Sequence, residues 1–221
     1  MPSLPGDVTW LAVPYAIAGL VWGIAADRIG ARWPAHEDGS VRKIDWRTPL
    51  VAVLAAVALA MVPVRFTDLG ERLLFTVFFA AGVLLLATDL DQKLMPDVVT
   101  LPLILLGLVA LAWGGNTLVT KASPWIAVAG AVLIPLLLLA FSLPFGAGAF
   151  GGGDVKFLMG AGLLLGAVRL VLAIFAGLVM STAVIVTLLI SRRITLKSYI
   201  PFGPFLIAGA VWIALLPSAG G

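Results

Sequence analysis

Long apolar runs separated by short polar segments make up most of this sequence. The runs show no alternation of apolar and polar positions with a period of two, so they are not expected to be strands. A helix of about 17–25 apolar residues crosses a bilayer and satisfies its own backbone in lipid. The pattern therefore predicts an all-α polytopic membrane protein with about eight transmembrane segments, at residues 8–26, 48–64, 73–88, 98–113, 124–143, 157–167, 170–190 and 200–216.

These segments are expected to form a single membrane-embedded domain over residues 1–221. Within it, residues 8–64 form an N-terminal two-helix region with a polar loop at 27–47, and residues 73–216 form a six-helix region. The segment at 157–167 is short for a crossing. Counting it as one decides on which side of the membrane every later loop lies.

Composition and charge support a membrane protein. Of the 221 residues, 62% are hydrophobic and 11% are charged, which is far outside the range of a soluble domain. The basic residues fall in short loops, where they act as topology signals and do not indicate nucleic acid. With the loop at 27–47 placed inside, the inside set is Arg28, Arg32, Arg42, Lys43, Arg47, Lys93, Lys156, Arg192, Arg193 and Lys197, and the outside set is Arg65, Arg72, Lys121 and Arg169. This bias predicts a multi-pass protein of the cytoplasmic (inner) membrane, with residues 89–97 and Asp154 on the cytoplasmic side.

Two acidic clusters stand where apolar runs end. The first contains Asp89, Asp91 and Asp97, and the second is Asp154 behind the glycines at 151–153. A charged group at membrane depth is costly and marks a functional site by default. The glycines remove every Cβ from the approach to Asp154, so backbone or substrate can come close to it. Two carboxylates from distant helix ends are the minimum for hydrolysis by a pair that shares a proton.

Each of these residues also has a structural interpretation. Asp154 could cap the helix that follows it, and Asp97, which follows a proline, fits the same role well. Asp89 directly extends an apolar run and should be the most buried of the first cluster. Lys156 either orients Asp154 or reaches the interface as a snorkelling lysine, and the sequence leaves both open.

Three stretches taken together resemble the type IV prepilin peptidases, intramembrane aspartyl proteases of the GxGD class. Residues 88–97 with Pro102 resemble the first aspartate motif of that family, residues 151–156 resemble its GxGDxK motif, and residues 200–205 resemble its C-terminal signature. The resemblance implies the GxGD protease architecture, with Asp89 and Asp154 as the catalytic pair. The residues that it implies for substrate binding or support are Gly151, Gly153, Lys156, Asp91, Asp97, Pro201 and Gly203.

The same resemblance implies a reaction and its partners. An aspartic-type endopeptidase of this family cuts the leader peptide from a type IV prepilin or pseudopilin on the cytoplasmic side, just before the hydrophobic helix. Proteolysis by paired carboxylates is expected to need no cofactor and no metal. The expected partners are the prepilin substrate and the lipid bilayer, without nucleic acid.

One feature departs from the family pattern. Bifunctional members carry paired CxxC motifs in the first cytoplasmic loop and methylate the new N-terminus with S-adenosylmethionine. This chain has no cysteine, and its loop offers only His36, Glu37 and Asp38 as a compact set of ligands. The zinc-bound subdomain is therefore expected to be missing, and S-adenosylmethionine is expected only if methyl transfer is retained. The basic stretch at 42–47 is interpreted as a topology anchor.

Two other functions fit part of the pattern. Asp89 and Asp91 could hold Mg²⁺ beside a phosphate in a membrane transferase, but the second cluster offers one aspartate and no arginine clamp. Asp89 and Asp154 could instead relay protons in a transporter, although no paired broken helices indicate inverted repeats. Removal of divalent ions would separate the transferase from the protease.

Overall fold

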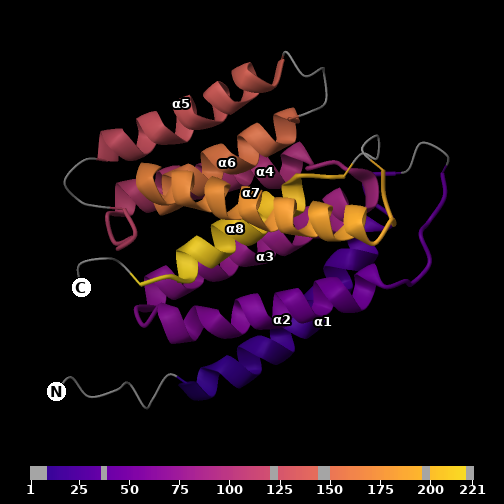
Figure 1. Cartoon of the computed structure of the whole chain (residues 1–221). Coiled ribbons are helices and arrows are strands. Elements are labelled where there is room, and N and C mark those ends of the chain that lie inside the picture. Colours follow the sequence, from indigo (N-terminus) through magenta and orange to yellow (C-terminus); the bar gives the residue numbers. More distant parts are fainter. Residues whose placement is uncertain (1–8, 36–38, 120–123, 144–149, 196–199, 218–221) are drawn as a thin grey trace.

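The computed structural model describes residues 9–35, 39–119, 124–143, 150–195 and 200–217. This described part of the chain forms eight α-helices and one short 3₁₀ helix, η1 (Thr9–Leu11) (Figure 1). The α-helices are α1 (Ala12–Gly30), α2 (Arg47–Arg65), α3 (Leu69–Gln92), α4 (Asp97–Trp113), α5 (Pro124–Ser142), α6 (Gly152–Leu165), α7 (Ala167–Ile190) and α8 (Gly203–Leu215).

Successive helices run in alternating directions, so the connections fall at two ends of the bundle (Figure 1). One end carries the residues of both acidic clusters, and we call it the acidic end. There Arg47 at the start of α2 contacts Asp91 at the end of α3, and Lys156 in α6 contacts Asp97 at the start of α4. The charge bias predicted that both clusters lie on one side, and the structure agrees. Which side of the membrane the acidic end faces remains a prediction.

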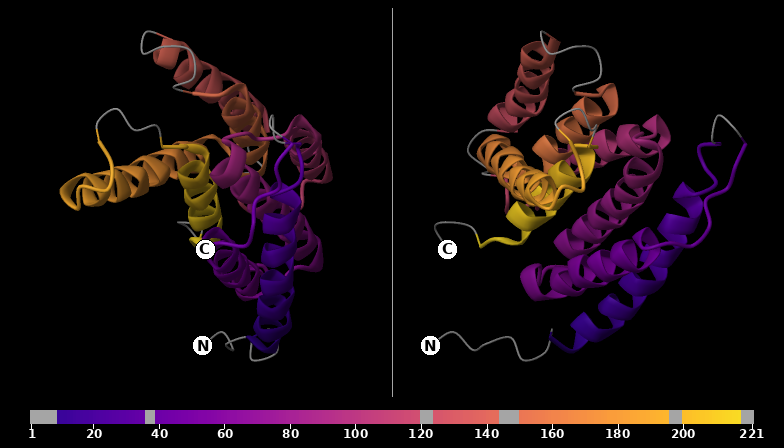
Figure 2. Two further views of the ribbon diagram at one scale, coloured as in Figure 1. Left: turned by 90° about the vertical axis from the view of Figure 1, so that its right-hand side faces the viewer. Right: turned by 45° about the vertical axis from the view of Figure 1, so that its right-hand side comes forward.

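The helices form two groups, one in which α1 and α2 pack together against α3 and one arranged around α6. The pair α1 and α2 packs closely together and also contacts α3, while α6 contacts α4, α5, α7 and α8 (Figure 2). The indole N–H of Trp22 in α1 donates to the carbonyl of Ala80 in α3 at 2.9 Å. Since α8 also contacts α3, the ends of α3, α6 and α8 meet at the acidic end.

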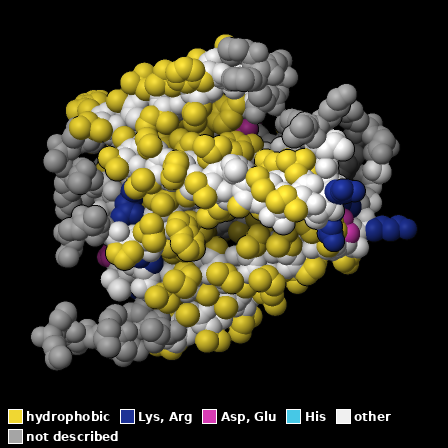
Figure 3. All heavy atoms as spheres, viewed as in Figure 1, with side chains coloured by type: hydrophobic (Ala, Val, Ile, Leu, Met, Phe, Trp, Pro, Cys, Tyr) yellow, Lys and Arg dark blue, Asp and Glu magenta, His cyan; other side chains and the backbone are white. Residues whose placement is uncertain are grey.

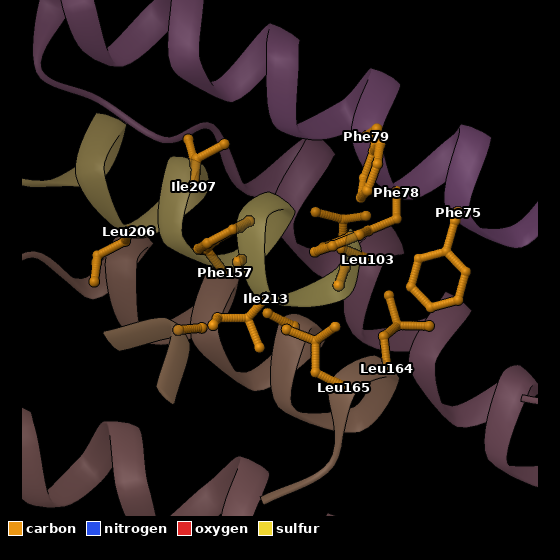
Figure 4. Close-up of a cluster of buried hydrophobic side chains, with 14 of the residues drawn as sticks. Phe75, Phe78, Phe79, Leu103, Phe157, Leu164, Leu165, Leu206, Ile207 and Ile213 are labelled. Carbon is orange, nitrogen blue, oxygen red and sulfur yellow. The ribbon is translucent and has the colours of Figure 1, made fainter. Parts of the chain in front are cut away.

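The hydrophobic core shown in Figure 4 lies between α3, α4, α6 and α8. Phe78 of α3 stacks on Phe157 of α6 with ring centroids 6.3 Å apart. Helix α6 is the innermost, because nearly every residue from Phe157 to Leu165 is buried. Close-packed side chains resist small displacements, so this core holds the ends of α3, α6 and α8 in fixed positions.

Three helices are longer at the acidic end than their apolar runs, and the first is α1, which continues past Ala26 to Gly30. Helix α3 continues past Thr88 to Gln92, and Lys93 stops it in the left-handed conformation at φ 56°. Helix α6 begins at Gly152, whereas the sequence pattern placed its start at 157. The predicted boundaries were wrong here because hydropathy marks the segment in lipid, while capping residues decide where a helix stops. Asp89, Asp154 and Lys156 therefore lie inside helices.

The surface and the helix lengths identify a membrane protein. Apolar side chains cover the body of the molecule in Figure 3, with Lys and Arg toward its ends. Among the described residues, α1, α2, α3, α5 and α7 are long and apolar enough to cross a membrane, and α4 and α8 are shorter apolar helices. The predicted all-α polytopic membrane fold is confirmed. Helix α6 has 14 residues, about 21 Å at ~1.5 Å per residue, so eight full crossings and the division at 8–64 and 73–216 remain predictions.

Candidate active site

Asp89 is a buried carboxylate with an unused oxygen. It occupies the last turn of α3 and is 6% exposed, so it is the most buried of Asp89, Asp91 and Asp97 as whole residues, as expected. Its Oδ2 has no hydrogen-bond partner among the described residues. Because a buried polar atom is normally paired, an unpaired carboxylate oxygen is typical of a group reserved for a ligand, a water or a reaction.

Asp154 approaches Asp89 from the first turn of α6. Its Oδ2 accepts a hydrogen bond at 3.0 Å from the backbone N–H of Gly151, the residue before the helix. It thus helps to cap α6 from within the helix. The remaining oxygen of Asp154 is not used by that bond, and the charges of Asp154 and Asp89 are close enough to interact. The structure therefore brings together the two carboxylates that the sequence proposed as a pair.

Met95 lies between the start of α6 and the start of α8. A Cβ placed on Gly153 would lie 2.8 Å from the Cβ of Met95, and one placed on Gly203 would collide with the Met95 side chain. Gly153 is therefore a close-packing position against the loop after α3. The absence of a Cβ at Gly153 makes room for Met95, which corrects the sequence interpretation that this glycine clears a path to Asp154. At Gly152, in contrast, an added Cβ would meet nothing within 4 Å.

Gly203 lies directly against Asp89. It is the first residue of α8, and a Cβ there would be 2.7 Å from Asp89 Oδ2 and 2.9 Å from Asp89 Cγ. The N-terminus of α8 thus closes one side of the buried carboxylate. Pro201 lies two residues before this helix, and its supporting role remains a prediction.

Lys156 pairs with Asp97 and not with Asp154. Its Nζ is 2.6 Å from both carboxylate oxygens of Asp97, and this contact joins the starts of α6 and α4. Asp97 is the first residue of α4, where Pro96 occupies the N-cap position. The expectation that Asp97 is the N-cap is therefore wrong, because proline already supplies the turn into the helix and leaves the carboxylate free to bind Lys156.

The Lys156–Asp97 pair is expected to matter little for cleavage of a peptide substrate. The two side chains are 35% and 58% exposed, and exposed ion pairs contribute about 0.2–1 kcal/mol. Asp97→Asn and Lys156→Gln should each keep cleavage rates within about threefold of the unchanged protein, which initial-rate assays in detergent would measure. A loss of more than about thirtyfold in both variants would show that this pair belongs to the reaction centre.

Asp91 takes part in an ion network that sequence reasoning missed. Its Oδ1 is 2.7 Å from Nη1 of Arg47 and 2.7 Å from Nε of Arg42. Arg42 also pairs with Asp45 and with Asp27 of α1. The basic stretch at 42–47 was interpreted as a topology anchor, and its spacing carried no signal that two of its arginines turn inward to α3.

Metal ligands are sparse in the described part of the chain. The residues that the structure describes contain no group of three His, Cys, Asp or Glu side chains placed to hold a metal ion. His36, Glu37 and Asp38, which the sequence singled out as the weak cluster of the loop, lie outside the described residues.

The described structure is a helical membrane bundle that brings two carboxylates together at the ends of α3 and α6, and the sequence comparisons place it in a family. The profile of the type IV leader peptidase family matches residues 74–187, just over half of the chain. The match begins within α3, ends within α7 and includes both acidic clusters. The chain therefore belongs to the type IV leader peptidase family, which confirms the resemblance.

Relatives from several bacteria agree with this assignment. The chain is 34% identical over 202 residues to a prepilin leader peptidase/N-methyltransferase of Dickeya chrysanthemi, covering 85% of this chain and 65% of that protein. It is 36% identical over 184 residues to a protein of the same name from Aeromonas hydrophila, covering 80% and 61%. A third, from Burkholderia pseudomallei, is 33% identical over 181 residues, covering 82% and 53%. The chain thus spans about three fifths of the length of these relatives. No solved structure matches it.

Proposed function

We propose that this protein is an aspartic endopeptidase that removes the leader peptide from type IV prepilins or pseudopilins at the cytoplasmic face of the membrane. The observation that carries the proposal is the pairing of Asp89 and Asp154 from α3 and α6, with one oxygen of Asp89 buried and unpaired among the described residues. Family membership and the names of the relatives support the choice of substrate.

The chemistry follows from a shared proton. With one carboxyl protonated and one ionised, the ionised group takes a proton from a water held between them while the water oxygen attacks the peptide carbonyl carbon. The protonated group donates a hydrogen bond to the carbonyl oxygen. The C–N bond then breaks, the amine nitrogen receives a proton from the pair, and the carboxylic acid and amine products leave. Neither a cofactor nor a metal enters this balance.

An apolar groove offers a place for the hydrophobic segment that follows the cleaved bond, and its lining includes neither Asp89 nor Asp154. The groove has a volume of about 620 Å³ and lies between α3 and α4, with Trp22 of α1 on one side. Its lining includes Leu84, five residues before Asp89, and Val98, which follows Asp97. A hydrophobic substrate helix lying there would present its polar end to the acidic end.

A magnesium-dependent transferase is not favoured by the arrangement. The two aspartates that would hold the ion point to different partners: Asp91 is paired with Arg42 and Arg47, while Asp89 packs against Gly203. Carboxylates that hold Mg²⁺ have to converge on one point.

Incubation with candidate prepilins tests the proposed function. The purified protein in liposomes should convert a prepilin into two products whose masses place the cut just before the hydrophobic segment, and Asp154→Asn protein should leave the prepilin intact. Intact prepilins after incubation with the unchanged protein, across pilin and pseudopilin candidates, would contradict the proposal.

Cleavage is expected to be independent of metal. Elemental analysis should find no stoichiometric zinc, because the loop at 27–47 contains no cysteine and structural zinc normally takes four cysteine or histidine ligands. Chelators should leave the cleavage rate unchanged, and the product should carry little or no added methyl group when S-adenosylmethionine is supplied. About one zinc per chain would contradict the first expectation, and clean methylation of the product the last.

A further inference from the structure

The acidic end contains a second polar cluster beside the carboxylate pair. It consists of Asp27, Arg28, Arg42, Asp45, Arg47, Thr48 and Asp91, and we call it the ion network. Its three arginines and three aspartates balance in charge. The side chains of Asp27 and Asp91 are 1% and 3% exposed, so both carboxylates depend on their partners within the protein.

Asp27 and Asp91 connect opposite sides of the network. Asp27 in α1 accepts a hydrogen bond at 2.6 Å from the hydroxyl of Thr48 in α2, and it also pairs with Arg42. Arg42 reaches Asp91 through its Nε, and Arg47 reaches Asp91 through Nη1. The guanidinium of Arg42 thus bridges a carboxylate of α1 and a carboxylate of α3.

The last turn of α3 is therefore held from the side opposite the candidate active site. Asp91 is tied to the loop before α2 and to the start of α2. The next residue, Gln92, donates from Nε2 to the carbonyl of Gly30, the last residue of α1, at 3.0 Å and to the carbonyl of Pro34, in the segment after α1, at 2.7 Å. Asp89 lies in the same turn and faces Gly203 of α8. Asp89 and Asp91 belong to the same helical turn, so contacts that hold Asp91 also restrain the backbone that carries Asp89.

We propose that Asp91, Arg42 and Arg47 are positioning residues, which hold the last turn of α3 so that the Asp89 carboxylate stays aligned with Asp154. This inference rests on the proposed function. Paired carboxylates must be held within about 0.5 Å of the productive geometry, and the end of a helix next to a loop is the part of it that frays most readily. A network of buried, charge-balanced pairs resists fraying because separating any pair leaves an uncompensated charge.

Steady-state kinetics on a cleavable prepilin distinguish positioning from simple stability. Arg47→Gln should lower kcat by about tenfold to a hundredfold, since misplacement by about 1 Å can cost ~10²-fold, while KM changes by less than about twofold. Arg47→Lys should recover part of the loss, because lysine keeps the charge but not the planar fork of donors. The matched control is Lys43→Gln, which removes an exposed cation of the same loop and should leave kcat unchanged.

A distance measurement tests the same inference without any activity. The chain contains no cysteine, so spin labels can be attached to cysteines introduced at Leu94, after α3, and Ile190, at the end of α7, which are 44% and 78% exposed. Arg47→Gln and Asp91→Asn should each broaden or shift the distance distribution between the labels, whereas Lys43→Gln should not.

The two measurements separate the possible failures. If no prepilin is cleaved by the unchanged protein, the proposed function fails, and the label distances still decide whether the ion network holds α3. If cleavage occurs but Arg47→Gln leaves both kcat and the distance distribution unchanged, the inference is wrong. It is equally wrong if Arg47→Gln lowers only the melting temperature while folded protein retains full kcat.

Discussion

Asp89→Asn and Asp154→Asn are each expected to lower leader cleavage by about a thousandfold, while the protein remains folded in membranes. Asparagine has nearly the shape of aspartate but can neither take nor release a proton, and general acid–base catalysis by one group contributes about 10²–10⁴-fold. Since Asp89 Oδ2 has no partner among the described residues, its replacement removes no hydrogen bond at that atom. Single-turnover cleavage of a prepilin, followed by mass spectrometry, measures the loss.

The control for this expectation is a third aspartate of the same acidic end. Asp97→Asn removes a carboxylate that is bound to Lys156 and half exposed, and it should keep most of the activity. Elution as a single species in detergent and an unchanged melting temperature would show that the two inactive variants are folded. Near-normal cleavage by Asp89→Asn would refute the assignment of the first catalytic residue, and Asp91 would then be the next candidate.

The overall arrangement of the helices could be predicted from the sequence, because apolar runs of this length have few options in a bilayer. The distribution of lysine and arginine also predicted that residues 89–97 and Asp154 share one end. The ends of the helices were harder to predict. The apolar runs end at the polar residues Asp89 and Asp154, although both of these residues lie inside helices. Lys93 in the left-handed conformation and the glycine before α6 set the actual limits.

The closeness of Asp89 and Asp154 could be predicted, but the contacts around them could not. Family resemblance pointed to Asp89 and Asp154, whereas the partner of Lys156 depends on how α4 and α6 pack, which no local pattern specifies. The inward turn of Arg42 and Arg47 is a similar case. A basic stretch before an apolar run is typical of a topology signal. Only the packing of α1 and α2 on α3 shows that Arg42 and Arg47 pair with the buried carboxylate of Asp91.

The glycines show how one residue type serves different purposes at one site. Gly151 supplies its backbone N–H to Asp154, Gly153 allows Met95 to pack against α6, and Gly203 allows α8 to reach Asp89. Gly152 has open space around it. The sequence indicated a need for small residues at 151–153, but space for a substrate was only one of the possible reasons.

Gly203→Ala is expected to lower cleavage by about a hundredfold, the second large effect. The added methyl would lie 2.7 Å from Asp89 Oδ2 and 2.9 Å from Asp89 Cγ, and it would also collide with Met95. Either α8 or the carboxylate has to move by a substantial part of an ångström, and a displacement of about 1 Å can cost ~10²-fold in rate. Overpacking of this kind typically costs ~1–3 kcal/mol, so the protein should still fold.

Gly152→Ala is the matched control, because it adds the same methyl at the start of α6 with nothing within 4 Å. Cleavage rates of both variants, compared with their melting temperatures, decide the matter: Gly152→Ala should remain active, and Gly203→Ala should be folded and slow. Equal activity of the two variants would show that the start of α8 does not confine Asp89, because the methyl added at Gly203 would then not displace the carboxylate.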